Sequence, residues 1–325
     1  MFLAPLNYDK YFNKVFSNER IAKRFLEDFL ETGINEFEML KGKLRVTDNA
    51  SLVEFDFRCK IDNSFVILDM QQWYKRDVTQ RFYIYHALNT GLQLEKLPSK
   101  RVLYDYSYQK SKKVEDYRAL LPVLTLVWMA DDSLDFKDDY VAYSMSPEIV
   151  VEFVKNKKLW HKPEIVELLK ERARLLEVLD NQTKELQFLA KNRLIFMLQK
   201  NTVKNKNKAR YVKWFEFAEK TKNTDNKKED FQEYLDDEIF CEMMKRLSKD
   251  TLTDDDFSYI QNEKTFWEEV ERFEQGIYEV AWNEGEAKGE KSKALEIARR
   301  LKEKGFDDDL IAAISGLSTD EITRL

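Results

Sequence analysis

The sequence predicts a mixed α/β core over about the first 150 residues, followed by a mostly helical C-terminal half. Three observations predict this class. Apolar residues near the start recur every three or four positions, which is typical of helices. An alternating segment is followed by a run that is apolar on both faces, which indicates two strands of one sheet. Helical periodicity then returns before another apolar run, and the order helix, hairpin, helix, strand is typical of an α/β fold.

The opening segment, residues 8–30, is expected to be helical with a short break near Ser17-Asn18. Its apolar residues are mostly three or four positions apart, namely Phe12, Val15, Phe16, Ile21, Phe25, Leu26, Phe29 and Leu30. This spacing places them on one face of a helix. We therefore assign these phenylalanines to the core and not to a surface that stacks nucleic-acid bases.

Two strands joined by a turn are expected next. One face of residues 52–61 is apolar (Val53, Phe55, Phe57, Cys59, Ile61) and the other is polar (Glu54, Asp56, Arg58, Lys60). Asp62-Asn63-Ser64 has the composition of a turn. Residues 65–71, Phe-Val-Ile-Leu-Asp-Met-Gln, are apolar on both faces up to the acid, which predicts a central strand.

The rest of the chain is expected to complete the core and then to form two further segments. A helix is expected from about Asp77 to Lys96, and a buried strand over Leu121–Met129 tolerates Pro122 at its start. After Pro163 the pattern is nearly all helical, and the basic stretch Lys204–Arg210 is expected to be an exposed connection. We predict a core over residues 1–150, a helical extension over 151–282, and a charged linker with a small helical unit over 283–325.

Composition restricts the classes of protein without selecting one. The chain has 325 residues, 43% of them hydrophobic, and no run approaches the roughly 20 apolar residues that span a membrane. Cys59 and Cys241 are too few for a disulfide framework or a zinc cluster. We expect a cytoplasmic protein with no membrane partner. The net charge of −6 disfavours binding to nucleic acid, but it does not exclude it, because contact with phosphates needs only a local basic strip.

Asp56 and Asp69 are the candidate chemical groups. Hydrolysis of a phosphodiester needs an activated water and neutralisation of phosphoryl charge, and one or two Mg²⁺ ions held by carboxylates supply both. Asp69 ends an otherwise apolar strand, where an uncompensated charge is costly. Gln71 shares its strand face, and Glu54 shares that of Asp56 as an auxiliary acid. No glycine-rich phosphate loop is present, so no nucleotide cofactor is expected.

The arrangement of an acid, a strand–turn–strand and then acid-x-Gln resembles the PD-(D/E)XK nucleases, and among them the recombination-promoting (Rpn-like) nucleases and putative transposases. The similarity covers most of the chain with gaps and is strongest over residues 8–130 and 280–325. It includes the opening Asp9-Lys10-Tyr11-Phe12-Asn13-Lys14 helix, the series Arg81, Tyr83, Tyr85, Gln93, Leu94, the strand after Tyr117, and the tail with Gly305 and Gly316-Leu317-Ser318. Residues 98–113 have the character of an insertion.

This resemblance implies a restriction-endonuclease-like core and a metal-dependent DNA endonuclease, and it suggests recombination or mobile-element movement as the setting. Asp56 and Asp69 would hold Mg²⁺, with Mn²⁺ or Ca²⁺ as substitutes and the Met70 carbonyl as a third ligand. Gln71 would replace the usual lysine, and Asp9 would be an accessory acid. Lys14, Arg81 and Tyr85 would contact DNA. A homodimer would allow both strands to be cut.

Other interpretations remain open from the residues. Asp56 can be a solvated strand residue, and Arg81 with Tyr85 can be an ordinary pair on a helix surface. The replacement of lysine by Gln71 also allows a catalytically degenerate protein that binds DNA or a protein partner without cutting. The C-terminal unit can be a regulatory or oligomerisation module. His86 and His161 match no triad or zinc spacing and receive no role.

Overall fold

The fold was analysed in a computed structural model of the chain. It describes residues 1–45, 52–72, 78–105, 110–131, 134–146, 148–156, 165–180, 184–266, 268–269, 272, 294–296, 298–299, 302, 308–315 and 317–323. Met1–Leu252 and Thr253–Leu325 form two compact units. No helix among the described residues is both long and apolar enough to cross a membrane.

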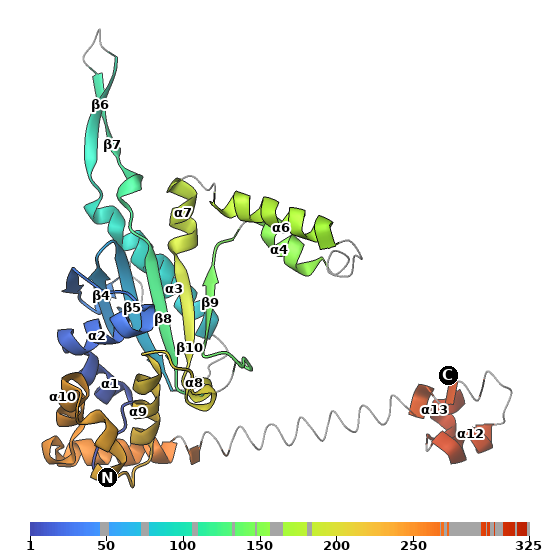
Figure 1. The fold of residues 1–325 in the computed structure, drawn as a ribbon. Helices are drawn as coiled ribbons and strands as arrows, with labels where there is room; N and C mark the ends of the chain where they lie inside the picture. Colours follow the sequence, from blue (N-terminus) through green and yellow to red (C-terminus); the bar gives the residue numbers. More distant parts are fainter. Residues whose placement is uncertain are drawn as a thin grey trace. The chain divides into compact units, whose positions relative to one another are not determined.

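The first unit contains a mixed six-stranded sheet in the order β1-β4-β5-β8-β10-β9 (Figure 1). Its strands are β1 (Phe37–Met39), β4 (Phe57–Ile61), β5 (Ser64–Gln71), β8 (Val123–Met129), β9 (Tyr140–Ser144) and β10 (Arg193–Leu198). β5, β8 and β10 run parallel, while β1 and β4 on one side and β9 on the other are antiparallel to their neighbours. The expected α/β class with a central mixed sheet is confirmed at this level.

Helices and two small sheets surround the central sheet. The described helices of the first unit are α1 (Asp9–Phe16), α2 (Glu19–Leu30), α3 (Val78–Gly91), α4 (Glu148–Lys155), α6 (Ile165–Asp180), α7 (Lys184–Lys191), α8 (Gln199–Asn205), α9 (Val212–Lys222) and α10 (Glu238–Leu247). Its short 3₁₀ helices are η1 (Leu92–Lys96), η2 (Tyr117–Ala119), η3 (Lys228–Tyr234) and η4 (Lys249–Thr251). β2 (Lys43–Arg45) pairs with β3 (Leu52–Glu54), and β6 (Ser99–Asp105) pairs with β7 (Lys110–Glu115) in a hairpin that projects from the sheet (Figure 1).

The opening helices pack on one face of the sheet through aromatic rings. The expected break lies between α1 and α2, where the Asn18 side chain caps α2 by accepting hydrogen bonds from two backbone N–H groups. The buried phenylalanines of both helices surround Trp128 of β8, to which α9 adds Trp214 and Phe215. The assignment of the helix phenylalanines to the core is therefore confirmed.

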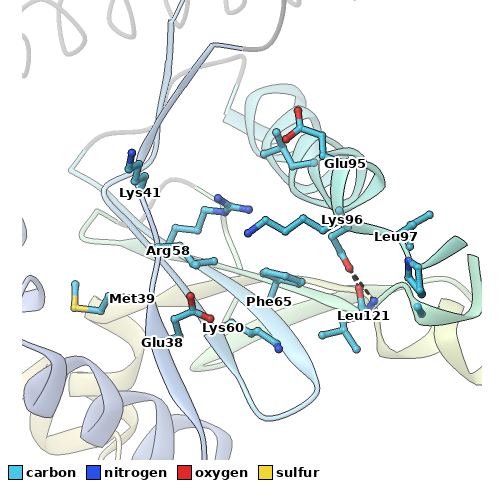
Figure 2. Close-up of a pocket in the computed structure, with 15 residues that line it drawn as sticks. Glu38, Met39, Lys41, Arg58, Lys60, Phe65, Glu95, Lys96, Leu97 and Leu121 are labelled. Atoms are coloured by element: carbon cyan, nitrogen blue, oxygen red, sulfur yellow. Dashed lines mark hydrogen bonds between the residues drawn. The ribbon is translucent and has the colours of Figure 1, made fainter.

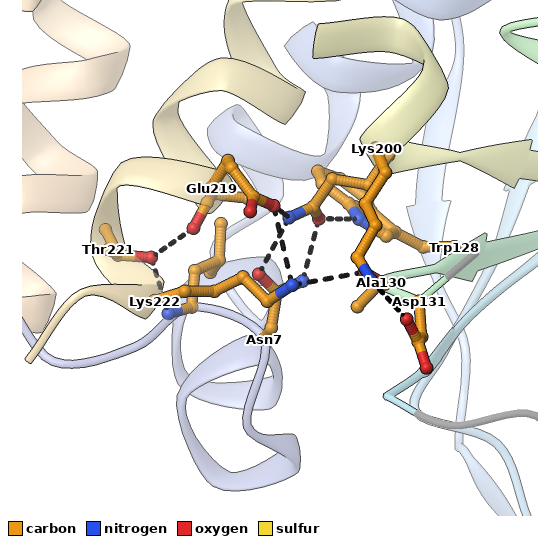
Figure 3. A network of polar contacts seen from close by, with 11 residues as sticks. Asn7, Trp128, Ala130, Asp131, Lys200, Glu219, Thr221 and Lys222 are labelled. Atoms are coloured by element: carbon orange, nitrogen blue, oxygen red, sulfur yellow. Dashed lines mark hydrogen bonds and ion pairs between the residues drawn. The ribbon is translucent and has the colours of Figure 1, made fainter. Parts of the chain in front are cut away.

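A polar network fastens the chain start to the sheet (Figure 3). The buried Gln199 side chain accepts hydrogen bonds from Trp128 Nε1 at 2.7 Å and from Asn7 Nδ2 at 2.9 Å, and it donates to Glu219. Lys222 donates to the carbonyl of Ala130. Because buried polar groups are costly without partners, these bonds fix how α8, α9 and β8 meet.

Helix α3 covers the opposite face. Val78 and Phe82 pack against Val127 and Met129 in one apolar cluster, and the His86 ring hydrogen-bonds Thr125 Oγ1 at 3.0 Å. The helix expected from about residue 77 to Lys96 is confirmed, with its last turn in the 3₁₀ form as η1. His86 thus has a packing role, and His161 lies outside the described residues.

Two strand predictions need correction. Residues 52–61 do not form one strand: β3 belongs to a separate two-stranded sheet, and β4 begins only at Phe57. The chain after Pro163 is not uniformly helical, because β10 lies between β8 and β9. Its sequence, Arg-Leu-Ile-Phe-Met-Leu, is a short apolar run, and periodicity does not separate a buried strand from a buried helix over so few residues.

The basic stretch at Lys204–Arg210 is largely exposed, as expected, and hydrogen bonds fix its position. α8 continues to Asn205, and Asn205 and Asn207 each donate a 2.7 Å hydrogen bond to the buried Asp139 carboxylate. Arg210 lies 3.7 Å from Asp28. The asparagines therefore fix this segment, while its lysine side chains are largely exposed.

The second unit has a small core of its own. Ala298, Ile311, Leu317 and Ile322 are buried together, and the described helices here include α12 (Asp308–Ser315) and α13 (Thr319–Thr323). Ser318 caps α13, since Glu321 N donates to its Oγ and Ser318 N donates to the Glu321 carboxylate. The linker predicted from residue 283 lies, up to residue 293, outside the described residues.

Candidate active site

Asp56 and Asp69 face each other at one end of the β4–β5 hairpin. Phe57 is paired with Leu68, so Asp56, one residue before β4, stands opposite Asp69. The Met70 backbone amide donates a 2.9 Å hydrogen bond to Asp56 Oδ2. The Asp56 backbone amide donates a longer hydrogen bond, of 3.5 Å, to Asp69 Oδ2. The backbone of each strand therefore holds the carboxylate of the other.

Burial sets the electrostatics of this pair. Asp69 is 5% exposed, and burial raises its pKa well above the usual range, with the nearby Asp56 charge as the second cause. Burial is also the main cause of the raised pKa of Asp56, and Asp9 adds to it, whereas the Met70 amide, Asn13 and Arg81 lower it. Two charged carboxylates are costly here, and a bound cation would offset that cost.

Gln71 marks a point on which two oxygen atoms converge. Its Nε2 donates 2.8 Å hydrogen bonds both to Asp69 Oδ1 and to the Met70 carbonyl. Its Oε1 accepts a hydrogen bond from Arg81 Nη2. The amide group thus lies where two candidate metal ligands meet, and Arg81 holds it there.

The donor set fits a hard divalent cation. Carboxylate oxygens of Asp56 and Asp69 and the Met70 carbonyl are the oxygen ligands that Mg²⁺ prefers, and Mg²⁺ commonly keeps several waters in its shell. Within the described ranges, no group of three or more His, Cys, Asp or Glu side chains could hold a metal. A metal here would therefore depend on the backbone carbonyl and on water beside the two aspartates.

Helix α1 supplies a residue that sequence reasoning missed. Asn13 Nδ2 donates to Asp56 Oδ1 at 3.4 Å, and the charge of Asp9, one helical turn earlier, acts on the same carboxylate. The signal available in the sequence was the four-residue spacing from Asp9 to Asn13, which puts both on one helix face. Lys14 is on this helix, where its carbonyl accepts a hydrogen bond from Arg246, and the Glu54 side chain lies outside the described part of the structure.

Arg81 and Tyr85 have different surroundings. Arg81 belongs to the site through Gln71, and its Nε is buried without a hydrogen-bond partner in the described structure. The Tyr85 ring packs edge-on against Phe55 at 5.1 Å and Phe82 at 5.6 Å. The fold thus gathers Asp56, Asp69, Gln71 and Arg81, and it places Tyr85 in the adjoining aromatic cluster.

Comparison with known proteins finds similarity over parts of the chain. Residues 291–325 match the model for the "Rpn/YhgA-like nuclease family, C-terminal HTH domain". The uncharacterized protein YpaA of Escherichia coli (strain K12) is 36% identical over 53 residues, which are 16% of this chain and 87% of YpaA. No solved structure matches the chain. The chain therefore belongs to one family with YpaA, and its residues 291–325 are similar to the C-terminal HTH domain of the Rpn/YhgA-like nuclease family.

Proposed function

We propose that the chain is a Mg²⁺-dependent DNA endonuclease whose active site contains Asp56, Asp69 and Gln71, with Mn²⁺ or Ca²⁺ as possible substitutes. One observation carries the proposal: the buried Asp69 faces the half-buried Asp56, and Asp69 Oδ1 and the Met70 carbonyl both lie 2.8 Å from the Gln71 side-chain nitrogen. Such a site is costly for the free protein and suited to a divalent cation.

Each residue has a defined part in this proposal. A bound Mg²⁺ would supply Lewis-acid activation of water and of the scissile phosphate. Asp56 and Asp69 would hold it as carboxylates, and Asn13 and the Met70 amide keep the Asp56 carboxylate in position. The Gln71 amide turns from Asp69 towards the water or the phosphate. The Arg81 guanidinium, which donates to Gln71, would then lie near the developing negative charge.

DNA is the proposed substrate because of the domain attached to this site. The match over residues 291–325 is to a helix-turn-helix domain, a class of module that places a helix in the major groove. A setting in recombination or mobile-element movement and a homodimer that cuts both strands are parts of the same proposal.

A second candidate is a degenerate relative that binds DNA or a protein without cutting. The observation that favours it is Gln71 itself, because an amide cannot supply the positive charge of a lysine. Arg81 can compensate, since its guanidinium donates to Gln71 and lowers the pKa of both aspartates.

Plasmid nicking by purified full-length protein tests the proposal. Supercoiled DNA is incubated with wild type, Asp69→Asn and the control Asp225→Asn, each in EDTA, Mg²⁺, Mn²⁺ or Ca²⁺. Asp225 is an exposed loop acid in a different part of the unit. We expect nicking that needs a divalent ion in wild type and the control, and its loss in Asp69→Asn with unchanged circular dichroism.

The other outcomes separate the two candidates. Cleavage by folded Asp69→Asn would remove the site from the chemistry. Intact DNA binding without cleavage under any ion would favour the degenerate relative.

A further inference from the structure

A second concave site lies along the same hairpin, beyond the candidate active site. It is a pocket of about 610 Å³ between β1, the β4–β5 hairpin, η1 and the segment that precedes β8 (Figure 2). Four basic side chains line it, namely Lys41, Arg58, Lys60 and Lys96, against two acidic ones, Glu38 and Glu95. The half-buried Phe65 ring adds an apolar wall. We call this site the basic pocket.

The positive charges of the basic pocket are not neutralised within the described residues. None of its six charged side chains takes part in an ion pair there, and Figure 2 shows the Lys96 ammonium and the Arg58 guanidinium pointing toward each other. Arg58 Nε donates a 2.6 Å hydrogen bond to Asn89, and among the described residues Asn89 Nδ2 is buried without a hydrogen-bond partner. Convergent like charges in a hollow favour a bound anion.

The register of the sheet relates the basic pocket to the aspartate pair. Lys60 is paired with Phe65 and Arg58 with Ile67, so these side chains share the sheet face of Asp56, Asp69 and Gln71. Phe65 precedes Asp69 by four strand residues, or roughly 13 Å. Successive phosphates of a B-form strand rise about 3.4 Å along the helix axis and also rotate around it, so this length separates phosphates that are about two nucleotide steps apart.

The charge continues onto the projecting hairpin. The basic pocket includes Leu97 and Pro98 immediately before β6, and the exposed strands β6 and β7 carry Lys100, Arg101, Lys112 and Lys113. Arg101 and Lys113 are directly opposite each other, an arrangement that is unfavourable unless an anion lies nearby. A two-stranded ribbon is also an element that the DNA major groove admits.

We propose that the basic pocket binds a backbone phosphate of the DNA strand, about two nucleotides from the scissile bond, with the β6–β7 hairpin following the same duplex. This inference rests on the proposed function for the identity of the polymer. Lys60, Lys96 and Arg58 receive the phosphate, and Phe65 contacts the adjoining sugar or base. The basic pocket thereby positions the strand across Asp56 and Asp69.

The test measures how salt affects DNA binding by the full-length chain. A fluorescent duplex longer than two helical turns is titrated in EDTA with an Asp69→Asn parent, over about 50 to 200 mM salt. The pocket variant adds Lys60→Gln and Lys96→Gln. The control instead adds Lys170→Gln and Lys191→Gln, two exposed lysines on α6 and α7. Every protein retains the C-terminal domain, so differences between them report the basic pocket.

We expect the pocket variant to reduce the slope of log affinity against log salt by about one to two, and its affinity near 0.1 M salt to fall by roughly tenfold or more. The control should match the parent. An unchanged slope, an equal effect in the control, or a parent that does not bind DNA would overturn the proposal. Loss of binding to an acidic peptide, with DNA binding intact, would overturn it in favour of a protein ligand.

Plasmid nicking by the same lysine variants with Asp69 restored keeps this inference separate from the proposed function. Nicking that is weakened by the pocket substitutions and unaffected by the control supports both. Nicking at the wild-type rate with an unchanged salt slope overturns the basic pocket alone. Absence of nicking in every protein, with the salt slope still lowered by the pocket substitutions, overturns the nuclease assignment and leaves the basic pocket as a phosphate site.

Discussion

At the scale of single residues, the most informative feature is an acid in a place that disfavours charge. Asp69 is buried at the end of β5, opposite Asp56, and their hydrogen bonds come mainly from backbone amides and from the Gln71 amide. Proteins keep such pairs where a cation or a proton joins them, because an isolated buried charge is expensive. The free-energy cost of placing two negative charges together is therefore the physical reason to expect a cation or a proton at this site.

This cost predicts how the pH affects the stability of the metal-free protein. The raised pKa of Asp69 means that the folded chain binds more protons than the unfolded chain from about pH 4 upwards to the raised value. Stability should therefore fall as the pH rises through that window. Asp69→Asn should be more stable than wild type by about 1–3 kcal/mol above neutral pH, and this advantage should vanish near pH 4. Urea unfolding in EDTA at several pH values measures it, and a variant less stable at every pH would contradict it.

Arg81 should set the pH at which a metal binds. Its charge lowers the pKa of both aspartates, so Arg81→Gln should raise both and delay their deprotonation. Because metal ligands must be deprotonated, half-maximal Mn²⁺ binding should move up by roughly half to one pH unit. Calorimetric titration with Mn²⁺ across pH measures the shift. Arg118→Gln, which removes an exposed arginine paired with Asp116, should leave the midpoint unchanged.

At the scale of elements, the position of Asp56 depends on a strand that changes sheets. β3 ends at Glu54, Phe55 N donates to the Gly42 carbonyl at 2.9 Å, and β4 begins at Phe57. A Cβ atom on Gly42 would lie 2.6 Å from the Phe55 carbonyl oxygen, so only glycine allows this approach of the two backbones. The bend places Asp56 at the end of the hairpin.

Gly42→Ala should therefore disturb both the fold and the site. Separating the two backbones should cost about 1–3 kcal/mol and displace Asp56 from Asp69, which weakens Mn²⁺ binding. Thermal unfolding and metal titration measure the two effects. Gly33→Ala is the matched control, because nothing lies within 4 Å of a Cβ there, and equal behaviour of the two variants would contradict this account.

At the scale of the whole molecule, the chain consists of two units with separate cores. The first contains the sheet, the aspartate pair and the basic pocket, while the second buries Ala298, Ile311, Leu317 and Ile322 among themselves. Because the two cores are separate, we predict that the units contribute independently to function. The first unit would carry out the chemistry, and the second would add affinity for DNA.

Deletion of residues 285–325 should consequently leave the unfolding temperature of the first unit unchanged. It should weaken duplex binding and leave the divalent-dependent nicking at saturating protein intact, because the aspartate pair lies in the first unit. Differential scanning calorimetry and anisotropy measure the two quantities. A lower unfolding temperature would show that the units support each other, and unchanged DNA affinity would contradict the binding role. Size-exclusion chromatography of the same protein tests whether the unit instead mediates oligomerisation.

The sequence by itself determined the local features. The alternation of Phe57, Cys59 and Ile61 with Arg58 and Lys60 predicted the faces of β4, and the spacing of apolar residues predicted α1, α2 and their break at Ser17-Asn18. The sequence also identified Asp69 as a candidate, because an acidic residue within an otherwise apolar strand can be recognised from the sequence alone. These features are local, since neighbouring residues fix the periodicity and the turn chemistry.

Only the tertiary structure decided how distant segments meet. β10 lies between β8 and β9, and the backbone of Gly42 lies close to that of Phe55, just before Asp56. Asn13 donates to Asp56 from α1, and Lys96 and Arg58 line the same basic pocket. Strand order and register depend on which apolar faces pack best across the whole domain. A local sequence pattern therefore does not predict them. The acids of the site could be named in advance, but the groups around them depend on the fold.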